Sequence, residues 1–248
     1  MRVLIAISSL KQYEDNHQAM RMTWLGDAIK AGMDYRFFLS DTISMTDKLK
    51  QKMNFALEQG FYDYMFSCFP DTYACPERLL LSGFDNFDYF GSVFKHPSPG
   101  ATLYCHGGAG YFLSRKAMEI AANNPTSYLN DDCWLGDVLS REDVSLGHTE
   151  DFRQHEGSPL RSNNVVTSHL SDAAHYQRRL DLGIAGCILD EHKNWIASEG
   201  NKPYTPTYKA VEEVRHPPAV QMSLQTQLDP RVPQPIGEAL YRPLRRKR

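Results

Sequence analysis

Apolar residues in the first 95 positions alternate between short runs and segments with helical spacing. Residues 3–8 form a continuous apolar run, which is typical of a strand buried on both faces of a sheet. Further strands are predicted at residues 35–39, 62–68 and 88–94. Strands that alternate with helices along the chain predict an α/β fold with a parallel sheet.

Two segments between these strands have the spacing of amphipathic helices, residues 16–31 and 46–57. Gly32 and Gly60 follow them and are predicted to be their C-caps, and a short helix is predicted from Pro76. Ligands of such sheets bind at the carboxyl ends of the strands, so the loops that follow the strands are candidate binding segments. These loops are residues 8–9, 40–41 and 69–72.

The middle of the chain is less regular. We predict a helix near residues 115–122, a second helix that begins at Asp131, and a last strand over 165–169. No internal repeat is present in the sequence.

The last 48 residues hold eight of the 14 prolines. Proline at this density favours an irregular, extended arm. We therefore expect a globular domain over residues 1–180 and a Pro-rich C-terminal extension over 181–248, which ends in a basic cluster at 242–248.

The composition is that of an ordinary globular protein. The chain has 248 residues, of which 42% are hydrophobic and 23% are charged, so a wholly disordered chain and a fibre are excluded. No apolar run approaches the roughly 20 residues that span a bilayer, and we expect no membrane contact. The net charge of −3 argues against a protein that coats nucleic acid through bulk charge.

The cysteines and the start of the sequence bear on the compartment. The apolar run at 3–8 is too short for a secretory signal. The five cysteines are odd in number, lack the spacing of a zinc ribbon and are expected to be reduced. We therefore expect the protein to be cytoplasmic, either in a bacterium or in the host cell of a phage or virus.

Polar residues suited to chemistry lie beside the predicted strands. Arg21, on the first helix, has the planar fork that suits a diphosphate, whereas Trp24 beside it is expected in the core. Asp71 follows a buried strand, where it can meet a ligand or a metal, although Pro-Asp-Thr is also an ordinary turn. His169 ends the last strand and is either a structural residue or a metal ligand.

Two further blocks are candidates. Residues 106–110, His-Gly-Gly-Ala-Gly, lack the spacing of a dinucleotide fingerprint, but their small residues permit a close approach of backbone to ligand. An ordinary turn explains them equally well. Asp131 and Asp132 either cap the helix that they begin or include a general base.

Taken in order, these motifs resemble the fringe and β-1,3-galactosyltransferase-like family of glycosyltransferases. The similarity covers roughly residues 2–175 and is carried by four blocks in the right order. They are the strand at 3–8 with Arg-x-Thr-Trp at 21–24, residues 64–80, Gly-Gly-Ala-Gly-Tyr at 107–111, and Asp-Asp-Cys-Trp-Leu-Gly at 131–136. The resemblance implies a GT-A fold, which is a Rossmann-like, mostly parallel central sheet flanked by helices. It also implies inverting transfer from a nucleotide sugar, of which UDP-sugars are the expected class, with Mn²⁺ (or Mg²⁺).

The resemblance also implies a role for each matching residue. Asp71 corresponds to the last aspartate of the Asp-Asp-Asp metal motif and His169 to a late metal-binding histidine. Asp132 corresponds to the catalytic base, with Asp131 as the second choice. The nucleotide sugar is assigned to residues of the strand ends, the first helix and the glycine block: Ser8, Arg21, Asp41, Gly107 and Gly108.

The chain departs from this family pattern at Phe69 and Pro70, where the family has two further aspartates. Loss of two carboxylates beside the metal leaves an inactive sugar-nucleotide-binding relative as one alternative.

The acceptor is open as well. A hydroxylated DNA base is favoured by the basic cluster at 242–248 and disfavoured by the acidic pI, and it requires base flipping. A glycan or protein acceptor is the alternative.

Overall fold

The computed structural model describes most of the chain: residues 1–95, 102–126, 130–154, 164–171, 175–198 and 203–211. The proline-rich stretch from 212 onward, with the basic cluster at 242–248, lies outside the described residues.

Seven strands of the described residues form the central sheet, in the order β12-β9-β5-β8-β3-β1-β2. They are β1 (Val3–Ser9), β2 (Asp34–Leu39), β3 (Tyr64–Cys68), β5 (Tyr89–Gly91), β8 (Tyr111–Ser114), β9 (Leu146–Thr149) and β12 (Tyr208–Ala210). β1 pairs in parallel with both β2 and β3, and β5 pairs in parallel with β9. β8 is antiparallel to β3 and β5, and β12 is antiparallel to β9. Five of the seven strands therefore run in one direction, and the predicted mostly parallel α/β sheet is confirmed.

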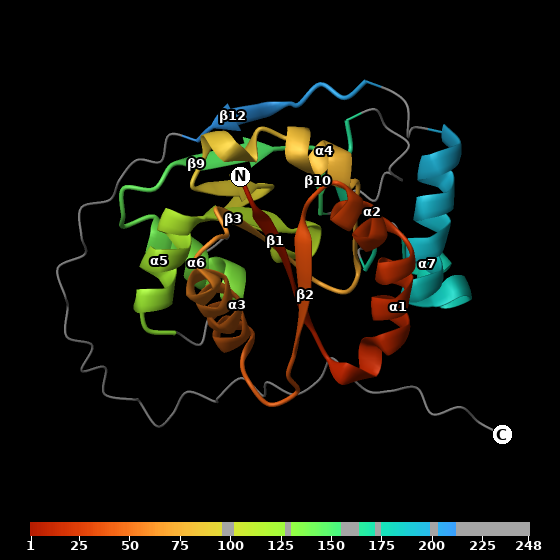
Figure 1. The fold of residues 1–248 in the computed structure, drawn as a ribbon, viewed down its shortest axis with the longest axis horizontal. Coiled ribbons are helices and arrows are strands. Elements are labelled where there is room, and N and C mark those ends of the chain that lie inside the picture. The colour runs from red at the N-terminus through yellow and green to blue at the C-terminus, as the bar shows by residue number, and fades with distance from the viewer. Residues whose placement is uncertain (96–101, 127–129, 155–163, 172–174, 199–202, 212–248) are drawn as a thin grey trace, which may run out of the picture. The chain divides into compact units, whose positions relative to one another are not determined.

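Helices cover both faces of the sheet (Figure 1). On one face lie α1 (Glu14–Met22), α2 (Trp24–Lys30), α4 (Pro76–Leu81) and α7 (Tyr176–Ser198). On the other face lie α3 (Met45–Gln59), α5 (Arg115–Asn123) and α6 (Asp131–Leu139).

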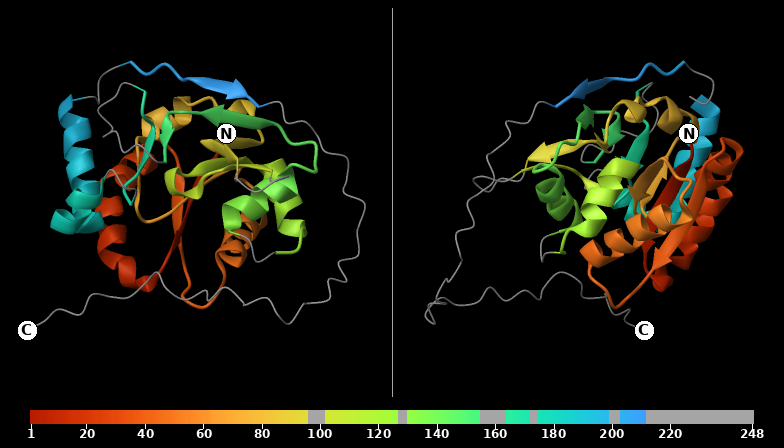
Figure 2. Two further views of the ribbon diagram at one scale, coloured as in Figure 1. Left: turned by 180° about the vertical axis from the view of Figure 1, so that it is seen from behind. Right: turned by 60° about the vertical axis from the view of Figure 1, so that its left-hand side comes forward.

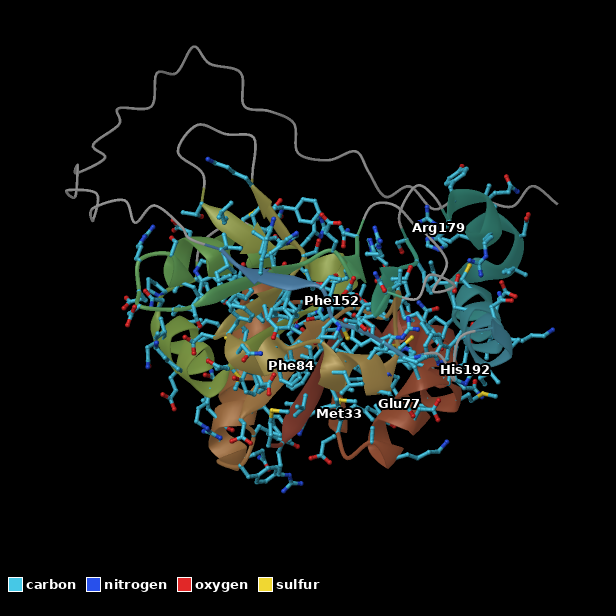
Figure 3. The ribbon with its side chains drawn as sticks, turned by 90° about the horizontal axis from the view of Figure 1, so that it is seen from above. Met33, Glu77, Phe84, Phe152, Arg179 and His192 are labelled. Atoms are coloured by element: carbon cyan, nitrogen blue, oxygen red, sulfur yellow. The ribbon has the colours of Figure 1, made fainter. Side chains whose placement is uncertain are left out.

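Side chains of β1 alternate between the two cores, as the pleat of a strand requires. Val3, Ile5 and Ile7 pack with α1 and α2, whereas Leu4 and Ala6 pack with α3 and α5. Phe84 and Phe152, labelled in Figure 3, are fully buried in the first of these cores. The strand is buried on both faces, as its continuous apolar sequence predicts.

The helix predicted over 16–31 is two helices, and the prediction of one helix is wrong. The chain leaves helical geometry at Thr23 (φ −122°, ψ −119°). The hydroxyl of Thr23 donates to the carbonyl of Ala19 at 2.6 Å, a side-chain bond that competes with regular helix. Gly32 follows α2 with a φ of +85°, and Gly60 caps α3 with a φ of +76°. Glycine adopts this left-handed backbone without strain.

The strand predicted over 88–94 is divided at Ser92. Its first part is β5, and its second part is β6 (Val93–Lys95), which pairs with β7 (Leu103–Cys105) in a separate ribbon. The helices α4, α5 and α6 begin at Pro76, Arg115 and Asp131, as the sequence predicts.

A small second sheet positions part of the candidate site. It contains β10 (Phe152–Arg153), β11 (Thr167–His169) and β4 (Thr72–Ala74), a strand that the sequence did not predict. β11 pairs antiparallel with β4, so that His169 lies opposite Thr72. The pairing brings the end of the predicted last strand to the loop that follows β3.

The end of the described chain returns to the sheet. α7 packs against α1 and turns at Gly183 (φ +68°). β12 then pairs with β9 and forms the edge of the sheet; Figure 2 shows it in blue beside the green β9. Residue 180 lies within α7, and the domain boundary placed there stays a prediction.

Candidate functional site

The candidate site lies where the parallel strands β1, β2 and β3 end. Because β1 pairs with both neighbours in parallel, its carboxyl end lies at the same edge of the sheet as theirs. Three other segments reach this edge: the Gly107–Ala109 turn (η3), the first residues of α6, and the end of β11.

Asp71 and His169 face one another at this edge. Nε2 of His169 lies 3.3 Å from Oδ2 of Asp71, and the hydroxyl of Ser171 donates to the same oxygen. The backbone N–H of Leu170 donates to the Asp71 carbonyl at 2.8 Å. Burial raises the pKa of the Asp71 carboxyl, but the hydrogen bonds from His169 and Ser171 outweigh it and leave the pKa below its ordinary value. Asp71 is therefore a carboxylate at neutral pH.

Gln154 contacts the other side of the imidazole, and the sequence analysis did not identify it. Its Nε2 lies 2.9 Å from Nδ1 of His169. Its Oε1 is buried without a hydrogen-bond partner among the described residues, as is Oδ1 of Asp71. Rotating the amide by 180° would let Oε1 of Gln154 accept a hydrogen bond from the Nδ1–H of His169, which leaves the lone pair on Nε2 of the histidine. That arrangement is the one found when histidine binds a metal.

Gly108 packs tightly against His169 and Gln154, and Gly107 packs against Phe69. A Cβ atom on Gly108 would lie 2.7 Å from Nδ1 of His169 and 2.5 Å from Oε1 of Gln154. A Cβ atom on Gly107 would lie 2.8 Å from the ring of Phe69. Because the glycines have no side chains, the turn can pack directly against the imidazole of His169 and the ring of Phe69.

The two aspartates at the start of α6 have different surroundings. Asp132 accepts hydrogen bonds from the N–H of Gly107 at 3.3 Å and from its neighbour Cys133 at 2.8 Å. Asp131 is buried beside the ammonium of Lys52. Burial raises the pKa of Asp131, and the positive charge of Lys52 opposes the rise. Asp132 is thus joined through Gly107 to the turn beside Asp71 and His169.

Two lysines of α3 are a feature that the sequence analysis missed. Lys48 and Lys52 are both buried, and each interacts electrostatically with Asp131. Nζ of Lys48 donates to the carbonyl of Ser9 at 3.1 Å, and Nζ of Lys52 donates to the hydroxyl of Ser67 at 2.6 Å. Their spacing of four residues on a predicted amphipathic helix, in one row with the apolar Ala56, is the signal that would have found them.

The other predicted nucleotide residues are Ser8, Asp41 and Arg21, and each has different surroundings. Ser8 is buried, and its hydroxyl has no hydrogen-bond partner among the described residues. Asp41 is exposed after β2, where its charge interacts with Lys48. Arg21 donates to Glu14 at 2.9 Å and lies over the ring of Phe37, so its guanidinium is held on the α1 side.

The structure thus brings together Asp71, His169, Gly107, Gly108, Asp131 and Asp132, but not Arg21. Within the described part of the chain, no group of three or more histidine, cysteine, aspartate or glutamate side chains is arranged to hold a metal. Asp71 and His169 offer two protein ligands. The five cysteines are free thiols, as expected.

Comparisons with known proteins add a limited likeness. No protein-family model matches the sequence, and no curated protein matches it. One similar solved structure is a glycosyltransferase involved in the glycosylation of the major capsid of PBCV-1, with 13% identity and a TM-score of 0.47. That match covers 71% of this chain and 98% of the other.

A second similar structure is A197 from STIV, with 13% identity and a TM-score of 0.39, covering 62% of this chain and 88% of the other. None of the helices in the described residues is long and apolar enough to cross a membrane.

Proposed function

We propose that this chain transfers a sugar from a nucleotide sugar of the UDP class to an acceptor hydroxyl, with inversion at the anomeric carbon. The observation that carries the proposal is the joining of Asp71 and His169 to Asp132 through the Gly107–Ala109 turn at the carboxyl edge of the sheet. The motif resemblance to the fringe-like family agrees with it, and membership of that family is part of the proposal.

A divalent cation, Mn²⁺ or Mg²⁺, fits the Asp71–His169 pair. Asp71 is ionised, its Oδ1 has no hydrogen-bond partner in the part of the chain that the structure describes, and rotation of the Gln154 amide would prepare His169 as a ligand. Two protein ligands suffice for an ion that retains waters and binds substrate phosphates. When bound, the ion would neutralise charge on the departing diphosphate.

Asp132 is the proposed general base. Its carboxylate accepts the proton of the acceptor hydroxyl while that oxygen bonds to the anomeric carbon. The bond from the anomeric carbon to the diphosphate breaks on the opposite side, and the diphosphate leaves with the electron pair. The N–H of Gly107 orients the carboxylate. Asp131, buried beside Lys52, is the second choice.

Two acceptor classes remain within the proposal. One is a hydroxylated base in DNA, whose backbone phosphates the basic cluster at 242–248 would bind, and the other is a glycan or protein. The five free thiols favour a reducing compartment, and we place the reaction in the cytoplasm.

A catalytically inactive nucleotide-sugar-binding protein is the second candidate function. Phe69 and Pro70 favour it, because the fringe-like family has two aspartates at the positions that these residues occupy before Asp71. UDP-sugar turnover, including hydrolysis in the absence of an acceptor, distinguishes the two candidates. Release of UDP by the wild type and not by Asp132→Asn supports the enzyme, and binding without release by the wild type supports the inactive relative.

A further inference from the structure

Two lysine side chains are buried one helical turn apart on α3. Lys48 is 2% exposed and Lys52 is 0% exposed. Burying an ammonium is unfavourable unless it is paired, and burying two near one another is more so. The pKa of Lys52 is lowered to about 8, mainly by burial and to a smaller extent by the charge of Lys48, while Asp131 opposes the shift. Replacing buried charges by apolar side chains of similar volume is often neutral or stabilising, so fold stability does not explain the two lysines.

The negative charge near the lysines only partly compensates them. Asp131 is the buried carboxylate that interacts with both ammonium groups, and Asp41, near Lys48, is exposed to solvent. Within the described residues each ammonium donates one hydrogen bond, to Ser9 and Ser67 respectively. An ammonium has three donors, so both lysines retain the capacity to bind oxygen atoms of a ligand.

The lysines lie beside the candidate site. The carbonyl that Lys48 contacts belongs to the last residue of β1, at the edge where ligands bind in such sheets. Nζ of Lys52 is 6.0 Å from the centre of the Phe69 ring. That ring packs against Gly107, whose N–H holds Asp132. The Phe69 ring therefore lies between Lys52 and the proposed catalytic turn.

We propose that Lys48 and Lys52 form a permanent cationic site for the diphosphate of the donor, in addition to the ion held by Asp71 and His169. This inference rests on the proposed function. It explains how a metal ion with only two protein ligands would suffice for the donor, because the lysines of α3 neutralise part of the diphosphate charge. A nucleoside diphosphate therefore binds this chain without a divalent cation, and more tightly with one.

Titration calorimetry with UDP and with uridine in the presence of EDTA tests the proposal. The wild type is expected to bind UDP without metal. Lys48→Met and Lys52→Met are each expected to weaken UDP binding by about ten- to a hundredfold, the loss typical of a hydrogen bond to a charged group. Uridine binding is expected to remain unchanged, because uridine has no phosphate. A merely structural role would weaken both ligands alike.

Lys50→Met is the matched control. Lys50 lies on the same helix, but its Nζ donates to the carbonyl of Asn124 at 2.8 Å, toward α5. This variant is expected to bind UDP as the wild type does. If Lys52→Met does not fold, Lys48→Met provides the same comparison.

Two results would overturn the inference and leave the proposed function standing: UDP binding that requires Mn²⁺ in the wild type, or equal UDP affinity in all three lysine variants and the wild type. Absence of UDP binding both with and without Mn²⁺ would instead overturn the proposed function.

Discussion

Gly108 lies so close to His169 that a Cβ atom on it would come within 2.7 Å of the imidazole Nδ1. The contact joins the glycine block to the strand that carries the histidine, and Thr72 strengthens it by donating to the Gly108 carbonyl at 2.8 Å. Asp71 lies beside Thr72 in the chain, so the glycine, the histidine and the aspartate form one packed unit. Each of the following predictions tests one part of it.

Gly108→Ala is expected to displace His169 and Gln154. Overpacking of this kind costs about 1–3 kcal/mol of unfolding free energy. UDP affinity in the presence of Mn²⁺ should fall at the same time. Gly32→Ala is the control. An added methyl group there meets no neighbour within 4 Å, so the variant is strained only by the positive φ of its backbone. It should lose stability but keep Mn²⁺-dependent UDP binding, as measured by denaturation and calorimetry. Equal binding losses in both variants would contradict the role of Gly108.

Gln154→Leu is expected to weaken Mn²⁺ binding by about ten- to a hundredfold, the usual effect of removing the partner that orients a histidine ligand. The ion can be followed by its paramagnetic resonance signal in the presence of UDP. Gln177→Leu is a control, since Gln177 is exposed on α7 and its amide donates to Asp181 on the same helix. Unchanged Mn²⁺ affinity in Gln154→Leu would show that Gln154 does not prepare His169.

Asp132→Asn is expected to lower sugar transfer by about 10²–10⁴-fold, the range that a general base contributes. UDP binding should stay close to that of the wild type, because the amide keeps the oxygen that accepts from Gly107. A radiolabelled-sugar transfer assay and calorimetry measure the two effects. Loss of transfer in Asp131→Asn with retention in Asp132→Asn would reverse the assignment of the base.

Lys52 is expected to make stability depend on pH. Its pKa is about 8 in the folded chain and near 10.5 when unfolded, so the unfolded state binds more protons between these values. The wild type should therefore gain stability relative to Lys52→Met as pH rises from about 8 to 10.5, by at most roughly 3 kcal/mol. Urea denaturation of both proteins across this range measures the difference. A constant difference would show that the pKa of Lys52 is the same in the folded and unfolded states, and that burial does not lower it.

Most of the sheet and helices could be predicted from the sequence, because their local patterns agree with their packing. β1 is continuously apolar and is buried on both faces, and α3 ends at a glycine with a positive φ. The break at Thr23 escaped prediction because it depends on which carbonyl the hydroxyl contacts. β4 escaped because three residues become a strand only through pairing with distant β11.

The candidate site was predictable only in part. Asp71, Asp132 and His169 follow strands or begin a helix, so their positions were visible in the sequence. Gln154 was not, because its role arises from contacts across the small second sheet. Lys48 and Lys52 share a helical row with the apolar Ala56, which is a sequence signal, but that they are buried depends on tertiary packing. Whether Arg21 contacts the donor stays a prediction, and its observed partner is Glu14.

The most direct test of the central claim is a thermal-shift titration of the wild type and Asp71→Ala with UDP, with and without Mn²⁺. A ligand at 100 times its dissociation constant stabilises the folded state by about 2.7 kcal/mol, which is readily measured. We predict a shift with UDP, a larger shift with UDP and Mn²⁺ together, and loss of the Mn²⁺ increment in Asp71→Ala. No shift of the wild type with UDP under either condition would contradict a nucleotide-sugar site in this chain.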